Sequence, residues 1–198
     1  MHISPKYTSD YWRRLKPKLK LELTSSTEND WRKAIDIFRD RIDGRFLKFI
    51  CLIEKDTFAG FAVLALDCLL IETLKQFWEG VRDLKGKSKP YFIQFLTNSS
   101  FGEFFNNGKA EMFYCQIRCG ILHQAETKEN SLIKTSGPLV KYTDDGKGLI
   151  VNRKLFHEQL MKEFETYISR LLDPSEQELR GKFIKKMDYI CRVSGEID

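Results

Sequence analysis

The chain has 198 residues, of which 42% are hydrophobic and 31% are charged. This composition excludes general disorder, and the length predicts one domain with a sizeable core. The 33 basic and 28 acidic residues give a formal net charge of +5, which permits a polyanionic partner without requiring one.

The cysteines and the hydropathy indicate where the protein resides. The five cysteines are an odd number set in apolar sequence, which is typical of reduced thiols in an intracellular protein. Residues 1–20 lack the apolar stretch of a secretory signal, and the apolar segment Phe58–Ile71 contains Asp67 and is short for a membrane span. We therefore expect a cytoplasmic protein with no membrane partner.

Residues 1–26 are expected to form a basic N-terminal arm. The segment Arg13–Lys20 is rich in lysine and arginine and is interrupted by Pro17, which predicts a solvated, loosely packed lead-in. This segment and the basic stretches Arg82–Lys89 and Arg180–Lys186 could each follow a phosphate backbone. Each is interpreted more simply as a solvated face.

Helical periodicity dominates the rest of the chain, residues 27–198. The strongest predicted helix covers residues 57–81, and its first half is apolar nearly all round, so it should be central. Asp67 is the isolated carboxylate of that half, whereas Glu72 lies on a later polar face. Further helices are predicted over residues 31–42, 46–53, 91–96, 109–125 and 153–172, and a last one begins after Asp173 and ends near Cys191.

Residues 131–152 interrupt the helical pattern. Residues 131–134, 139–142 and 149–151 have the composition of strands, and residues 144–148 have that of a turn. The sequence therefore predicts a mainly α fold with a small inserted β-hairpin.

The predicted helix 109–125 has two apolar faces. One face is an ordinary core stripe, formed by Ala110, Phe113, Tyr114, Ile117 and Ile121. The opposite face has little charge and carries Met112, Cys115, Cys119, Leu122 and His123. A helix that is apolar on both sides must be covered on both, so we expect Met112, Cys115, Cys119 and Leu122 to form the interface of a homodimer.

Arg118 and His123 stand on the same helix, five residues apart and therefore about 140° apart in an ideal helix. An arginine followed after four residues by a histidine, near the end of a bundle helix and after an apolar helix with embedded acids, resembles the signature of the HEPN superfamily. The resemblance covers roughly residues 27–191. It implies an up-and-down helical bundle that pairs with a second copy to bring both Arg–His sets into one cleft.

The resemblance also implies an activity. Active members are metal-independent endoribonucleases in which the RNA 2′-hydroxyl attacks the phosphate, and some belong to toxin or defence systems with an antitoxin or another partner. By this resemblance His123 would transfer protons and Arg118 would bind the phosphate, which suits imidazole and guanidinium chemistry. Asp67 or Glu72 would orient one of them, and no metal or cofactor is expected. Basic residues that could hold the RNA are Arg82, Lys85, Lys87 and Lys89.

Other interpretations remain open from the sequence. The chain could be a non-catalytic helical module that binds RNA or a protein. His123 could be a hydrogen-bonded core or interface residue, Arg118 could pair with Asp67 or Glu111, and Glu72 could pair with Lys75 at the surface. His157 is predicted to be a solvated helix residue. Three residues spaced by four could in principle hold zinc, namely Cys115, Cys119 and His123, but no fourth ligand is evident and we expect no metal site.

Overall fold

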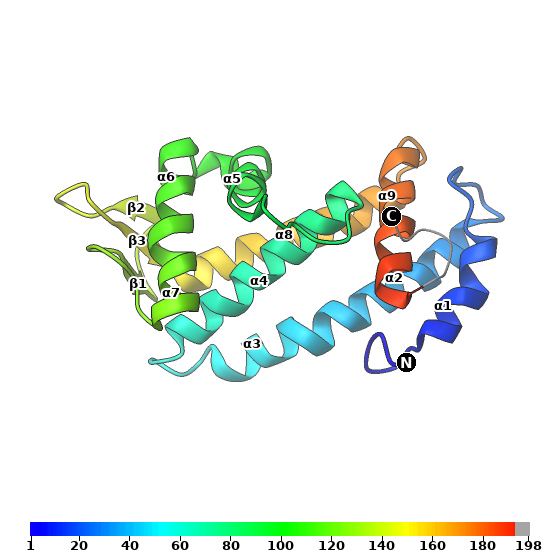
Figure 1. The fold of residues 1–198 in the computed structure, drawn as a ribbon, viewed down its shortest axis with the longest axis horizontal. Coiled ribbons are helices and arrows are strands. Elements are labelled where there is room, and N and C mark those ends of the chain that lie inside the picture. The colour runs from blue at the N-terminus through cyan, green and yellow to red at the C-terminus, as the bar shows by residue number, and fades with distance from the viewer. Residues whose placement is uncertain (193–198) are drawn as a thin grey trace. The chain divides into compact units, whose positions relative to one another are not determined.

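The computed structural model describes residues 1–192 and confirms a mainly helical protein with a small β insertion (Figure 1). The α-helices are α1 (Ser9–Leu15), α2 (Glu28–Ile42), α3 (Lys48–Ile53), α4 (Gly60–Glu79), α5 (Ser88–Asn98), α6 (Asn107–Met112), α7 (Cys119–Gln124), α8 (Arg153–Leu171) and α9 (Gln177–Cys191). Short 3₁₀ segments are η1 (Lys16–Lys18) and η3 (Ser100–Glu103), and π-helical segments are η2 (Asp43–Leu47) and η4 (Phe113–Arg118). The strands are β1 (Leu132–Lys134), β2 (Val140–Tyr142) and β3 (Leu149–Asn152). Within residues 1–192, no helix is both long enough and apolar enough to cross a membrane.

The chain forms two compact units, and the boundary between them falls inside α3, α4 and α8. The first unit contains residues 1–49 and 76–83 and the described residues from 165 onward, and the second contains residues 50–75 and 84–164. The expected division between residues 26 and 27 does not coincide with a boundary between these units.

Aromatic side chains fill the core of the first unit. The rings of Phe38 and Phe77 lie 4.3 Å apart, and Phe183 contacts both. Trp12 and Trp31 are fully buried, each with its ring near Phe183. The expectation of a loosely packed N-terminal arm is therefore wrong: α1 supplies Trp12 to the core, and the indole nitrogen donates to Asp188 at 2.8 Å.

The C-terminal basic stretch is also part of this packing. Arg180 is fully buried and donates to the backbone carbonyls of four residues: Leu21, Leu171, Asp173 and Pro174. Lys186 is nearly buried and donates to Gln76 and to the carbonyl of Arg82. The interpretation of residues 180–186 as a solvated face is therefore wrong for both cations, which satisfy carbonyl groups inside the unit.

The second unit is built around a phenylalanine cluster from α5, η3, η4 and α8. Phe113 and Phe156 stack at 4.9 Å with an interplanar angle of 8°. Phe92, Phe101 and Phe105 surround them. Of the predicted core stripe of helix 109–125, Ala110, Phe113, Ile117 and Ile121 are buried as expected, and Tyr114 is half-buried.

The β insertion is a three-stranded sheet in the order β1-β3-β2. β2 and β3 form the predicted antiparallel hairpin, but β1 adds to the other edge of β3 in parallel. The hairpin prediction was therefore incomplete. The central strand β3 is the most buried of the three, with Leu149 and Val151 fully covered, and a strand covered in this way can pair on both edges.

Candidate functional site

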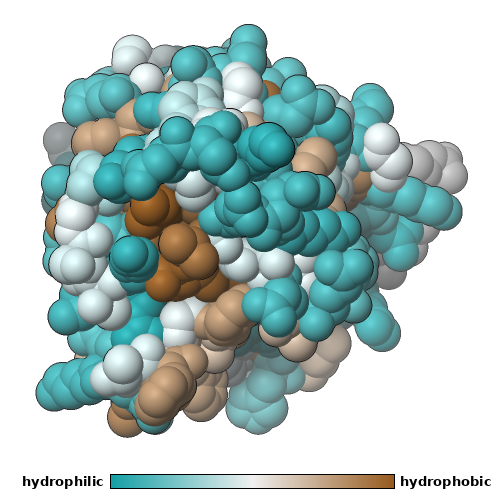
Figure 2. All heavy atoms as spheres, turned by 90° about the vertical axis from the view of Figure 1, so that its left-hand side faces the viewer, coloured by the Kyte–Doolittle hydropathy of each residue, from teal (hydrophilic) through white to brown (hydrophobic). Residues whose placement is uncertain are grey.

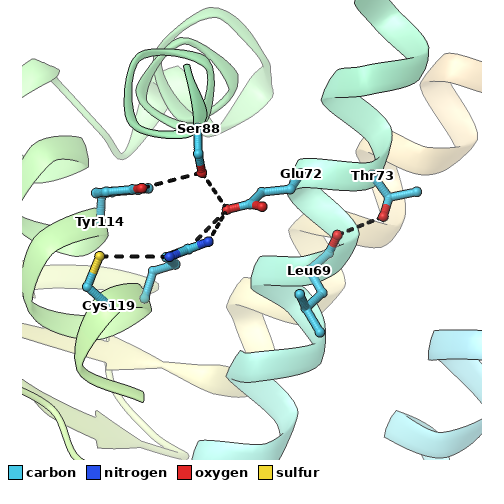
Figure 3. A network of polar contacts seen from close by, with 7 residues as sticks. Leu69, Glu72, Thr73, Ser88, Tyr114 and Cys119 are labelled. Atoms are coloured by element: carbon cyan, nitrogen blue, oxygen red, sulfur yellow. Dashed lines mark hydrogen bonds and ion pairs between the residues drawn. The ribbon is translucent and has the colours of Figure 1, made fainter. Parts of the chain in front are cut away.

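An ion pair between Glu72 on α4 and Arg118 at the end of η4 lies at the centre of the candidate site (Figure 3). The Nε and Nη2 atoms of Arg118 donate to the same oxygen, Oε1 of Glu72, at 3.0 and 2.7 Å. The two side chains are 14% and 17% exposed, so the pair is shielded from bulk water without being sealed from it. Both residues belong to the second unit.

Two hydroxyl groups extend this pair into a network. Ser88, the first residue of α5, donates to Oε1 of Glu72 at 2.9 Å, and the Tyr114 hydroxyl donates to Ser88 at 3.3 Å. The Arg118 guanidinium also lies over the Tyr114 ring, 5.2 Å from its centre. Three elements therefore fix the orientation of one guanidinium, as Figure 3 shows.

Electrostatics keep Arg118 charged. Burial alone would lower the pKa of Arg118, but the charge and the hydrogen bonds of Glu72 outweigh burial and raise the pKa. The Nη1 atom has one weak contact, with the Cys119 thiol at 3.9 Å. The guanidinium is thus a permanent cation that is held along one edge and retains donors on the other.

The π-helical segment η4 determines where Arg118 points. In a π-helix each amide bonds five residues back, and here the Cys119 amide donates to the Tyr114 carbonyl. Single π-turns within α-helices occur frequently at functional sites. A uniform 100° wheel over residues 109–125 could not show this local change of period.

The chain turns back directly after this helix. A Cβ atom at Gly120 would collide with the carbonyl oxygen of Glu126, and Lys128 donates its amide to the Gln116 carbonyl at 2.9 Å. Ala125 ends α7 in the left-handed conformation, with φ of 54°. Gly120 therefore allows the returning segment to lie against the helix that carries Arg118 and His123.

His123 is exposed on α7, so it is not the core histidine that one interpretation allowed. It lies about 7.5 Å further along the helix than Arg118 at the usual rise per residue. Within residues 1–192 no hydrogen bond joins the two side chains. The structure thus places the two residues on one helix but does not bring them into contact within one chain.

Asp67 is not part of the Arg118 network. Its side chain is fully buried, and Oδ1 lies 2.7 Å from Nδ1 of His157 on α8. The prediction that His157 is a solvated residue is therefore wrong, because its side chain is only 15% exposed. Of the two acids expected to orient Arg118 or His123, Glu72 is the one that contacts Arg118. Of the partners that the sequence left open for Arg118, Asp67 pairs with His157 and Glu111 pairs with Lys89, and Arg118 pairs with Glu72.

The Asp67–His157 pair has its own electrostatics. Burial raises the pKa of Asp67, and the hydrogen bond and charge of His157 act in the opposite direction. Burial would lower the pKa of His157, but the hydrogen bond and charge of Asp67 more than offset it and raise the pKa. The second oxygen of Asp67, Oδ2, is buried without a hydrogen-bond partner within residues 1–192.

The predicted RNA-binding residues differ in their surroundings. Arg82, Lys85 and Lys87 are exposed. Lys89 forms an ion pair with Glu111 at 2.6 Å, and the hydrogen bond to Glu111 raises its pKa. Arg82 belongs to the first unit and the three lysines to the second.

The predicted dimer face is partly open to solvent. Met112, Cys115 and Cys119 are half-buried, and Leu122 is 36% exposed. On the face shown in Figure 2, apolar side chains gather in a recess bordered by hydrophilic ones. The second unit also exposes Leu132 and Leu155, so its surface offers apolar area beyond the predicted face.

No group of three His, Cys, Asp or Glu side chains in residues 1–192 is arranged to hold a metal ion, and this includes Cys115, Cys119 and His123. Comparisons of the chain with family models, with curated proteins and with solved structures found no match.

Proposed function

We propose that the protein is a metal-independent endoribonuclease of the HEPN type, in which Arg118 binds the scissile phosphate and His123 transfers a proton. The observation that carries the proposal is the Glu72–Arg118 pair, which holds a guanidinium by one edge five residues before the exposed His123. A preoriented cation of this kind stabilises charge that develops on a phosphate in the transition state.

The reaction requires no group beyond these side chains and the RNA. The 2′-oxygen of a ribose attacks the adjacent phosphorus, and the bond from phosphorus to the 5′-oxygen breaks. The products are a 2′,3′-cyclic phosphate and a 5′-hydroxyl. His123 as imidazole accepts the proton of the 2′-hydroxyl, and the imidazolium so formed donates that proton to the departing 5′-oxygen. The free donors of Arg118 bind the non-bridging phosphate oxygens.

The proposed active site is shared between two copies of the chain. Arg118 faces α4, whereas His123 is exposed and five residues further on, so one chain alone presents the two groups separately. A dimer formed through Met112, Cys115, Cys119 and Leu122 would place the Arg118 of one copy near the His123 of the other. Such an interface should bury at least about 1,000 Å² in total.

A non-catalytic module is the second candidate, and one observation favours it. Glu72 neutralises Arg118 and occupies two of its donors, an arrangement that also suits a structural ion pair. In that case the same surface would bind RNA or a protein partner without cleaving it.

The two candidates differ in a cleavage assay. End-labelled RNA of mixed sequence is incubated with the protein in excess EDTA, and the product ends are analysed for cyclic phosphate. We expect cleavage by wild type and a loss of about 10²–10⁴-fold in His123→Ala, the usual effect of removing a general acid or base. Arg118→Ala should lose a comparable amount, and Arg118→Lys should recover only part because an ammonium lacks the planar fork.

His2→Ala is the matched control, because His2 is also exposed and lies in the first unit. Its rate should equal that of wild type. Equal cleavage by wild type and His123→Ala would contradict the assignment of His123, and no cleavage by wild type would favour the binding module.

A further inference from the structure

A basic hollow of about 360 Å³ lies between α1–η1 and α2 in the first unit. Its lining residues are Tyr11, Arg14, Leu15, Lys18, Asp30 and Lys33. The volume falls within the range of about 300–1,000 Å³ that small-molecule sites occupy.

The sequence of the N-terminal segment explains why cations gather here. Four lining residues, from Tyr11 to Lys18, follow the spacing i, i+3, i+4, i+7 and so share one helical face. The neighbouring cations point elsewhere: Arg13 donates to Asp10 and to the Cys191 carbonyl, and Lys16 pairs with Asp188 at 2.5 Å. In this basic segment, Arg13 and Lys16 therefore contact α9, whereas Arg14 and Lys18 line the hollow.

The hollow has an excess of positive charge. Among residues 1–192, Asp30 is the one carboxylate that lines it, and it pairs with Lys33 at 2.9 Å. Within residues 1–192, neither Arg14 nor Lys18 makes an ion pair, which leaves two positive charges beside a neutralised pair. Lysine and arginine side chains without an anionic partner, grouped in a concave site, attract anions.

The hollow also has an aromatic wall. Tyr11 is half-buried, and its ring meets the Tyr7 ring edge-on at 5.1 Å, which restrains its orientation. Leu15, which is buried, adds an apolar side chain to the lining. A planar ring next to a forked guanidinium fits a ligand that has both a flat ring and a phosphate, because bases stack on tyrosine and phosphates accept two hydrogen bonds from arginine.

We infer that this hollow binds a nucleotide, with its phosphate on Arg14 and Lys18 and its base against Tyr11. The nucleotide could be free or part of a single RNA strand, since both present the same chemistry. This inference goes beyond the proposed cleavage and does not depend on it, because it concerns other residues and is tested by binding alone.

The test measures binding of the full chain to four probes: inorganic phosphate, ATP, a 2′-O-methyl RNA oligonucleotide and poly-glutamate. The 2′-O-methyl groups prevent cleavage by a 2′-hydroxyl, so binding is separated from catalysis. We expect ATP or the oligonucleotide to bind more tightly than phosphate and poly-glutamate. Arg14→Glu and Lys18→Glu should each weaken that binding by at least about tenfold, as expected when a charge-assisted hydrogen bond is lost.

The salt dependence distinguishes the two sources of the nucleotide. One phosphate of a single strand, held by Arg14 and Lys18 together, predicts a log–log slope of about −0.7 for affinity against salt concentration. An oligonucleotide that binds in this way, and more tightly than ATP, identifies an RNA strand. Tighter binding of ATP identifies a free nucleotide.

Lys20→Glu is the matched control, because it makes the same charge change in the same segment at an exposed residue that does not line the hollow. Its affinity should stay within about twofold of wild type. Equal weakening by Lys20→Glu, equal binding of poly-glutamate, or unchanged binding in Arg14→Glu and Lys18→Glu would each overturn the inference. Circular dichroism of each variant confirms that the helices are retained.

Discussion

The second unit contains two carboxylates on the same helix that are used in different ways. Asp67 is fully buried and meets one histidine, whereas Glu72 is 17% exposed and meets an arginine and a serine. A buried charge is costly unless it is paired and hydrogen-bonded, and Asp67 retains an oxygen without a partner in the described part of the chain. The Glu72 network is partly exposed to solvent, and it orients the Arg118 guanidinium, which keeps N–H groups free to donate hydrogen bonds.

The comparison separates a structural pair from a candidate catalytic one. Asp67 and Glu72 are only five residues apart on α4, but they differ in burial, in partner and in the expected consequence of their removal. We expect the Asp67–His157 pair to matter mainly for folding and the Glu72–Arg118 pair mainly for function. Four predictions test this difference.

The largest effect on stability is expected for Asp67→Ala. Removing one member of a buried pair typically costs about 3–5 kcal/mol, and here it leaves His157 without its partner. Urea unfolding of wild type and variant near pH 6 measures the difference. A loss below about 1 kcal/mol would mean that the buried pair is not a structural element.

Gly120→Ala tests the helix that carries the Glu72 partner. The added methyl group would collide with the Glu126 carbonyl oxygen, and overpacking of this kind costs about 1–3 kcal/mol. Gly108→Ala is the control. Gly108 lies in α6, which continues through η4 into α7, and a Cβ atom there would have no contact closer than 3.6 Å. Equal unfolding free energies for the two variants would contradict the close approach after α7.

Glu72→Gln should destabilise the protein less than Asp67→Ala does. It replaces a charged acceptor with a neutral one while keeping the size, so we expect a loss of about 1.5 kcal/mol. Glu72→Gln should reduce RNA cleavage more than Asp67→Ala does, because Arg118 loses the charged group that orients it. Ser88→Ala removes one neutral donor to Glu72 and should lower stability by about 1 kcal/mol or less. If Glu72→Gln unfolds as easily as Asp67→Ala and cleaves RNA normally, the contrast between the two carboxylates is wrong.

The smallest effect is expected from pH. Asp67 raises the pKa of His157 above 6.5, so the charged histidine stabilises the folded state fully below that pH. The contribution is lost as the pH rises through the folded-state pKa of His157. Between about pH 6 and about pH 9, the free energy of unfolding should therefore decrease more for wild type than for His157→Gln. A larger decrease in the free energy of unfolding for His157→Gln than for wild type would contradict the pairing of His157 with Asp67.

The sequence predicted those parts of the molecule that depend on local periodicity. The buried stripe of Ala110, Phe113, Ile117 and Ile121 follows from spacing alone, and so does the hairpin of β2 and β3. The change to π-helical geometry over Phe113–Arg118 leaves no mark in the spacing of apolar residues and could not be predicted from it.

Contacts between distant residues were the main source of error. His157 meets Asp67 across 90 residues, and Trp12 meets Asp188 across 176. In each case the local sequence is polar or basic and predicts a solvated residue. The partner that reverses this expectation lies on another helix, and one sequence without its fold does not identify it.

The central claim is that the active site combines Arg118 of one copy with His123 of a second copy. Mixed dimers of Arg118→Ala and His123→Ala chains, isolated with two different affinity tags, test it directly. In such a dimer one of the two Arg118–His123 pairs is intact, so the account predicts cleavage of labelled RNA at about half the wild-type rate, whereas either variant alone is inactive. Mixed dimers as inactive as the single variants, or a protein that stays monomeric during cleavage, would contradict it.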